Sequence, residues 1–114
     1  MLTSWEWKLN SLLIENMMTN IHDVKKNSTV KIDSDLQFFG SGGCNRFFGQ
    51  AKIRSNNRIR MEVLGISQMI CNDMNIETAY LDVLARVDSY AIDAGSLKLK
   101  QGNTVLAVFE VLQK

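Results

Sequence analysis

The sequence contains no proline, a single histidine, His22, and only two cysteines, Cys44 and Cys71. Without proline, turns must rely on glycine, asparagine, aspartate and serine, which occur where the hydrophobic pattern breaks. A catalytic thiol needs a base and a group that orients the base, and a zinc site needs three or four ligands at recognisable spacing. One histidine and no CxxC pair do not supply them. We therefore predict a protein that is not an enzyme, with no catalytic residue and no metal site.

A charge excess and a long apolar run are also missing. Thirteen basic and twelve acidic residues leave a net charge of +1, and the densest basic cluster, Arg54, Arg58 and Arg60, alternates with apolar residues around one turn. A nucleic-acid-binding surface is typically a basic stripe with a strong charge excess, so no nucleic acid is expected as a partner. No apolar run approaches the roughly 20 residues of a transmembrane helix. The first five residues lack the features of a signal peptide.

Cofactor motifs are absent as well. The glycine-rich segment 40–43 lacks the lysine and the serine or threonine of a phosphate-binding loop, and no helix pattern follows it. We expect no cofactor.

What the chain does contain is period-two alternation. Its hydrophobic fraction of 46% and charged fraction of 22% are ordinary for a globular protein, and no composition break divides residues 1–114, so we predict one domain. The alternation begins at Trp5, Trp7 and Leu9, whereas residues 13–27 have no clean period and read as a loop, with a short helical turn or an irregular strand as the alternatives. Further strands are predicted at these positions: 29–33, 36–39, 48–53, 58–63, 90–92 (with Tyr90 and Ile92 inward), 97–100 and 105–112. The last is apolar on both faces except at Glu110, which is typical of a central strand.

One helix is predicted at about residues 73–87. Ile76, Tyr80, Val83, Leu84 and Val87 recur on one helical face, and Asn72 is a suitable N-cap. About seven or eight short strands with one late helix predict a mainly β (α+β) domain, a small antiparallel β-barrel or strongly curved sheet. On the residues alone, the two cysteines are compatible either with one disulfide or with two buried thiols.

The segment Gly43-Cys44-Asn45-Arg46-Phe47-Phe48-Gly49 resembles the signature of the META domain, a family that includes the HslJ-type bacterial heat-shock proteins. The stretch 67–71, with Met69, resembles a second motif of that family, and the segment from Met74 to Leu81, with Glu77, resembles its helix start. The opening and closing strands match too, so the resemblance covers nearly the whole chain. It departs at Gln68, where the family usually has arginine, and at residues 72–73, where it often has proline. Residues 13–27 match poorly.

The resemblance implies a disulfide between Cys44 and Cys71, which would stabilise the fold by roughly 3–4 kcal/mol through loop closure. For the polar pair beside it, two interpretations stay open. In the first, Asn45 satisfies loop backbone groups and Arg46 pairs with Glu77 or Glu62. In the second, Arg46 faces an acidic group of a partner, beside exposed phenylalanines.

Two aromatic pairs, Phe38-Phe39 and Phe47-Phe48, each place neighbours on opposite faces of a strand. One ring of each pair therefore lies outside the core unless the helix or residues 13–27 cover it. Phe39, Arg46, Phe47 and Phe48 are the candidate interaction surface.

The family resemblance implies a non-catalytic envelope domain, in the periplasm or anchored to the outer membrane as a lipoprotein, associated with stress or virulence. It would present this surface to another envelope protein. The alternative is a carrier of a lipid or another hydrophobic ligand, because the architecture also resembles lipid-binding pilotins. A cavity lined by Trp5, Trp7, Leu97, Leu99 and Phe109 would favour the carrier, and a close-packed core would favour the interaction module.

Overall fold

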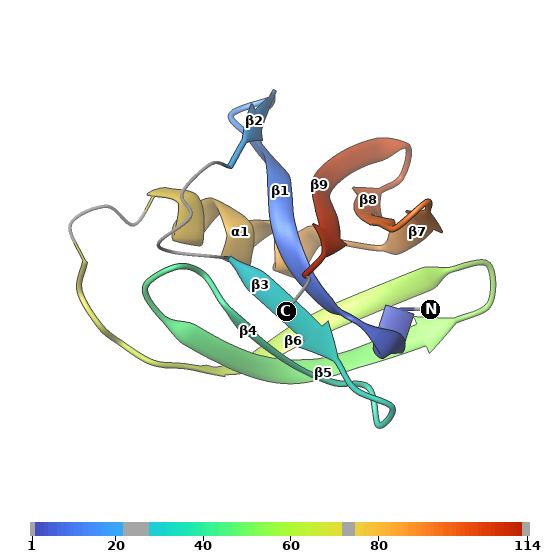
Figure 1. Ribbon diagram of the computed structural model, residues 1–114, viewed down its shortest axis with the longest axis horizontal. Helices are drawn as coiled ribbons and strands as arrows, with labels where there is room; N and C mark the ends of the chain where they lie inside the picture. Colours follow the sequence, from blue (N-terminus) through green and yellow to red (C-terminus); the bar gives the residue numbers. More distant parts are fainter. Residues whose placement is uncertain (1, 22–27, 72–74, 113–114) are drawn as a thin grey trace.

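The computed structural model describes residues 2–21, 28–71 and 75–112. Within these residues, a 3-10 turn, η1, at Leu2–Ser4 precedes nine strands and one helix (Figure 1). The elements are β1 (Glu6–Ile14), β2 (Met17–Asn20), β3 (Thr29–Ile32), β4 (Gln37–Ser41), β5 (Arg46–Arg54), β6 (Arg58–Ile66), α1 (Asn75–Arg86), β7 (Ser89–Asp93), β8 (Ser96–Gln101) and β9 (Thr104–Val111).

All nine strands belong to one antiparallel sheet, ordered β2-β1-β3-β4-β5-β6-β7-β8-β9, and β1 also pairs with β9. The extra pairing closes the strands into a ring, with β2 as a short flap on β1. The strand pairing of the ring is shortest between β6 and β7, where the register contains one residue pair, Arg58 and Ser89. The predicted strongly curved antiparallel sheet is confirmed, and because β9 lies between β8 and β1, its prediction as a central strand is confirmed too.

The core fills the inside of this ring, and α1 packs into it against β1 and β6. Figure 1 shows the long β5–β6 hairpin along one side, β7 to β9 on the other, and the helix behind β1. Four aromatic rings form a chain of contacts through the interior, with centroid distances of 5.6–6.1 Å. They are Phe38, Phe47, Tyr80 and Phe109. Three come from the sheet and one from the helix, so these contacts tie the helix to both sides of the ring.

Several details differ from the sequence prediction. The described part of the predicted loop, residues 13–21, is mostly strand: β1 continues to Ile14, and Glu15 and Asn16, with φ of 50° and 67°, turn the chain into β2. Left-handed conformations at both turn residues are typical of a two-residue hairpin, and this additional strand raises the count to nine. Residues 22–27, with His22, and the predicted N-cap Asn72 lie outside the described residues.

Two predicted inward side chains are not buried. Trp5 precedes β1 and is 49% exposed, and Ile92, near the open β7–β8 turn, is 36% exposed. Trp5 lies before the first strand, where alternation no longer determines burial. Ile92 lies inside β7, but β7 pairs with β6 only at Ser89, so Ile92 has a neighbouring strand on one side alone, β8.

Candidate functional site

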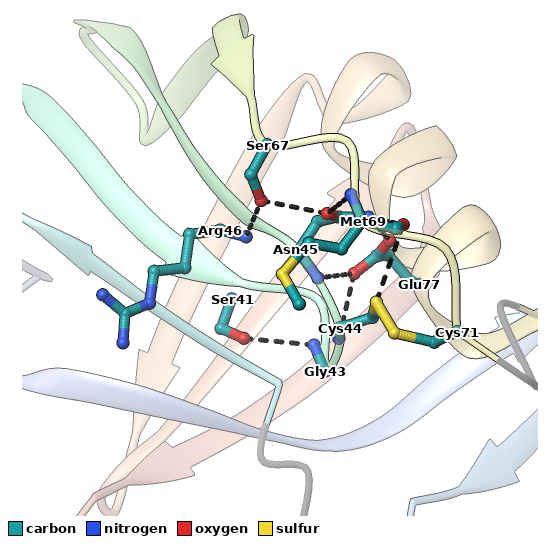
Figure 2. The surroundings of a disulfide bond; sticks show 9 residues. All are labelled: Ser41, Gly43, Cys44, Asn45, Arg46, Ser67, Met69, Cys71 and Glu77. Atoms are coloured by element: carbon teal, nitrogen blue, oxygen red, sulfur yellow. Dashed lines mark hydrogen bonds between the residues drawn. A yellow bond between two sulfur atoms is a disulfide. The ribbon is translucent and has the colours of Figure 1, made fainter.

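The glycine-rich loop and the segment that precedes the helix are joined by a disulfide between Cys44 and Cys71 (Figure 2). Cys44 lies between β4 and β5, and Cys71 lies shortly before α1. Their Cα atoms are 6.3 Å apart, a normal separation for this bond. The disulfide that the family resemblance implies is therefore present in the structure.

The carboxylate of Glu77, in the first turn of α1, is buried beneath this loop and is 3% exposed. Its Oε1 atom accepts hydrogen bonds from the backbone N–H groups of Cys44 at 3.1 Å and Asn45 at 2.6 Å. Its Oε2 atom accepts one from Asn45 Nδ2 at 2.8 Å. A Cβ at Gly42 would lie 2.4 Å from Glu77 Cγ, so only glycine lets the loop approach so closely. The three donors offset the desolvation of a buried carboxylate.

Asn45 connects this carboxylate to the segment after β6. Its Oδ1 atom accepts from Ser67 Oγ at 2.9 Å and from the backbone N–H of Met69 at 2.7 Å. Its Nδ2 group donates to Met69 O at 3.2 Å and to Glu77. The amide therefore uses both hydrogens and accepts twice, which is its full capacity. The expectation that Asn45 satisfies loop backbone groups is confirmed.

Arg46 does not pair with Glu77. Its backbone N–H donates to Ser67 Oγ at 3.1 Å, but its side chain is exposed and points away from the carboxylate in Figure 2. Within the described part of the chain, the one salt bridge joins Arg86 and Asp82, so the expected pairing of Arg46 with Glu77 or Glu62 is wrong. Three neutral N–H donors satisfy both oxygens of the Glu77 carboxylate without a cation.

Chemically, the cluster is suited to holding chain segments together. The sulfur atoms are bonded to each other and offer no thiolate, and the 3.7 Å approach of Cys44 Sγ to Met69 O is a contact without a hydrogen to share. Three donors occupy Glu77. Among the described residues, no group of three or more histidine, cysteine, aspartate or glutamate side chains is placed to hold a metal ion.

The two phenylalanine pairs divide as the strand geometry requires. Phe38 and Phe47 are 0% and 3% exposed, whereas Phe39 and Phe48 are each 51% exposed, so neither outer ring is covered. Phe39 on β4 lies directly opposite Phe48 on β5 in the register. Phe47 therefore does not belong to the candidate surface: it points into the core and contacts Tyr80.

Next to these rings, the outer face carries positive charge. Exposed Lys31 on β3 lies opposite Phe39, and exposed Arg46 precedes Phe48 by two residues on the same face of β5. We call Lys31, Phe39, Arg46 and Phe48 the aromatic face. Lys31 was not predicted for this surface, because only the register of β3 on β4 brings it there.

Most of the motif-like segment 43–49 serves the fold. Gly43 has φ of 108°, Cys44 is bridged, Asn45 and Phe47 are buried, and a Cβ at Gly49 would lie 2.0 Å from Glu62 O. Met69 contributes its backbone to the cluster, while its side chain is 60% exposed. Arg46 and Phe48 alone in the segment have exposed side chains outside both the core and the buried network.

The fold and this cluster define a class of small domains: a ringed antiparallel sheet whose helix is tied to a glycine-rich loop by a disulfide and a buried carboxylate. A sequence profile of the META domain matches residues 1–112, and the chain belongs to the META domain family. No protein among curated sequences matches it significantly.

Solved structures share the fold. An NMR structure of a protein from Burkholderia xenovorans is similar with a TM-score of 0.77 and 20% identity, covering 99% of this chain and 85% of that one. A crystal structure of a DUF4847 family protein from Bacteroides vulgatus gives a TM-score of 0.74 at 11% identity, covering 100% and 96%. At these identities the likeness concerns the fold alone. Within the residues described here, no helix has the length and apolar character to cross a membrane.

Proposed function

We propose that this META domain is a non-catalytic interaction module of the cell envelope that binds a partner protein through its aromatic face. The observation that carries the proposal is the direct pairing of two half-exposed rings, Phe39 and Phe48, on adjacent strands. Exposed aromatic clusters of this kind mark interaction surfaces, because burying both rings against a partner removes a large apolar area from water.

The support beneath the rings favours a rigid docking surface. Phe48 lies across Gly65 of β6, where a Cβ would be 2.3 Å from the ring, so the ring rests on the strand. The buried cluster of Asn45 and Glu77 fixes the beginning of β5, just before Arg46. A surface held in place before binding loses little conformational entropy when a partner docks.

Charge indicates the kind of partner. Lys31 and Arg46 place two cations at the edge of the rings, and neither forms an ion pair within the described residues. The complementary surface is an apolar recess bordered by carboxylates. The envelope location and the association with stress responses form part of the proposal and rest on family membership.

The alternative of a carrier with an internal hydrophobic site has little support. Trp7, Leu97 and Phe109 are 0% exposed, and Leu99 is 1% exposed. A cavity able to admit a lipid chain would leave accessible surface on these side chains, and Trp5 lies outside the core altogether. The close packing of the interior favours the interaction module.

The test is affinity capture from an envelope extract of the source cells, with the disulfide-bonded protein immobilised. The variant Phe39→Gln/Phe48→Gln should lose the bound partner while its melting temperature stays close to that of the wild type. Met17→Gln/Met18→Gln is the matched control, because it also removes two exposed apolar side chains, 71% and 44% exposed, but from β2. Retention of the same partner by the aromatic-face variant would contradict the proposal.

A further inference from the structure

The far end of the β5–β6 hairpin carries a second charged surface that the proposed function does not use. Four exposed cations, Lys52 and Arg54 on β5 and Arg58 and Arg60 on β6, alternate with inward residues and so share one face. In the register, Lys52 lies opposite Arg60, and Arg54 lies opposite Arg58. We call these four residues the basic hairpin. They continue the outer face of β5 away from the aromatic face, beyond Gln50.

This arrangement does not serve stability. Like charges directly opposite each other on adjacent strands destabilise a sheet, whereas opposite charges there stabilise it. None of the four cations forms an ion pair with any residue that the structure describes. The whole chain carries a net charge of only +1, so the concentration of charge is local. Glu62 lies two residues beyond Arg60 on the same face but forms no ion pair with the cluster, so an anion that binds between the four cations reduces their mutual repulsion.

The basic hairpin also borders a cleft of about 540 Å³. Its other walls are Ile59, Val87 and Asp88, where the chain leaves α1 and enters β7. The N–H of Ile59 donates to Asp88 O at 3.0 Å and holds the two walls together. The Asp88 carboxylate, the one acid of the cleft lining, accepts from the N–H of Gly102 through both oxygens, at 3.0 and 3.1 Å. The size is within the usual range for small-ligand sites.

The side chains indicate the chemistry of the ligand. Three of the four are arginines, whose planar fork of N–H donors matches phosphate oxygens. Residues two apart on a strand are separated by about 7 Å, and paired strands by about 4.8 Å, so the four positions form a compact group. A nucleic-acid surface would extend as a longer stripe. We propose that the basic hairpin and its cleft bind a compact ligand with two or more phosphate groups, as a free phosphate ester or in a lipid headgroup.

The first experiment titrates the protein with pyrophosphate by calorimetry and by amide NMR, at low ionic strength. We expect saturable binding, with shifts at residues 52–60 and 87–88. Arg58→Gln/Arg60→Gln should weaken binding about tenfold or more, because each lost arginine removes charge-assisted hydrogen bonds. It should remain folded, since it relieves two like-charge pairs.

Lys98→Gln/Lys100→Gln is the matched control. It removes the same charge at the same spacing on one strand, β8, where the paired residues on β7 and β9 are uncharged. We expect at most a twofold change. An equal loss in both double variants would show that net charge alone attracts the anion and would overturn the proposal.

A second arm separates the two sources of phosphate. The wild type and the Arg58→Gln/Arg60→Gln variant are sedimented with vesicles of phosphatidylcholine containing cardiolipin, whose headgroup carries two phosphates, and with vesicles of phosphatidylcholine alone. Binding of pyrophosphate supports a free phosphate ester as the ligand, and binding only to the anionic vesicles supports a lipid headgroup. In each case the Arg58→Gln/Arg60→Gln variant should lose the binding. Absence of saturable binding in both arms would overturn the proposal. Phe39→Gln/Phe48→Gln should bind pyrophosphate as the wild type does, so the two proposals fail independently.

Discussion

Asn45 donates to both oxygens of the Glu77 carboxylate, through its backbone N–H at 2.6 Å and its side-chain amide at 2.8 Å. The two residues lie 32 positions apart, one at the start of the sheet's longest hairpin and the other in the first turn of the helix. With the neighbouring disulfide, this pair fixes the helix to the loop.

Replacing Glu77 by glutamine should destabilise the protein. A glutamine keeps one carbonyl oxygen but turns an NH₂ group towards an N–H donor, so a buried donor loses its partner. We expect a loss of about 2–3 kcal/mol in the free energy of unfolding, measured by urea denaturation without reductant. Glu62→Gln, at an exposed position, should change it by no more than about 0.5 kcal/mol. Equal stability of Glu77→Gln and wild type would contradict the role assigned to the carboxylate.

The disulfide should be detectable and stabilising. Reduction and alkylation of the oxidised protein should add two alkyl groups that are absent when the unreduced protein is alkylated, as measured by intact mass. Cys44→Ser/Cys71→Ser should lower the free energy of unfolding by roughly 3–4 kcal/mol. Alkylation of both cysteines without reduction, under oxidising conditions, would show that the bond does not form.

The adjacent residues Phe47 and Phe48 should respond in opposite ways to truncation. Phe47→Ala leaves a cavity among the interior rings and should cost about 3–5 kcal/mol. Phe48→Ala removes a half-exposed ring that covers Gly65 and should cost less than about 1 kcal/mol. Thermal and urea unfolding of the two variants side by side will measure the difference. Similar losses would show that the strand register is wrong.

Gly49 should not tolerate a side chain. An alanine Cβ would lie 2.0 Å from Glu62 O and 2.5 Å from the Phe38 ring, so the β5–β6 pairing must shift. We expect Gly49→Ala to lower the free energy of unfolding by about 1–3 kcal/mol, and Gln50→Ala, exposed on the same strand, to change it little. An unchanged melting temperature for Gly49→Ala would argue against this packing.

Tyr80 should make the protein less stable at high pH. Burial raises the pKa of its phenol well above the ordinary value of 10.0, and its hydroxyl donates to Thr29 O at 2.9 Å. The unfolded chain releases this proton at lower pH than the folded protein does. The stabilisation is therefore fully present below about pH 10 and is lost as the pH rises towards the folded-state pKa. Urea denaturation between pH 8 and pH 11 should show a steeper decline for wild type than for Tyr80→Phe. Parallel declines would contradict this contribution.

Alternation predicted the sheet well, because a strand with one solvent-exposed face has hydrophobic and polar residues at alternate positions of its sequence. Trp7, Val30 and Leu97 all face the core as their patterns indicate. The same rule failed at Trp5, which lies before β1, and at Ile92, where β7 is no longer paired with β6. It also missed β2, whose exposed Met17 and Met18 carry no alternation to detect.

The candidate site was only partly predictable. The family resemblance identified Cys44 and Asn45 in the motif-like segment and Glu77 at the helix start, and one of the two interpretations paired Arg46 with Glu77 or Glu62, because a buried charge suggests a countercharge. Backbone N–H groups of the loop satisfy the Glu77 carboxylate instead. Because every residue other than proline has such a group, the sequence does not indicate which ones will donate. Ser67 belongs to the buried network around Asn45, and Lys31 belongs to the aromatic face. Both residues are brought there only by the way the strands pair, which the sequence does not show.

By itself, the amino-acid sequence determined the local pattern: which side chains are hydrophobic, where glycine permits a close approach of the backbone to a neighbouring segment, and that the chain forms a curved sheet with one helix. Tertiary structure alone decided which cations lie opposite each other on the β5–β6 hairpin and which donors reach Glu77. The reason is physical. Burial preference belongs to each residue, whereas cross-strand register and hydrogen-bond partners arise only when distant segments meet.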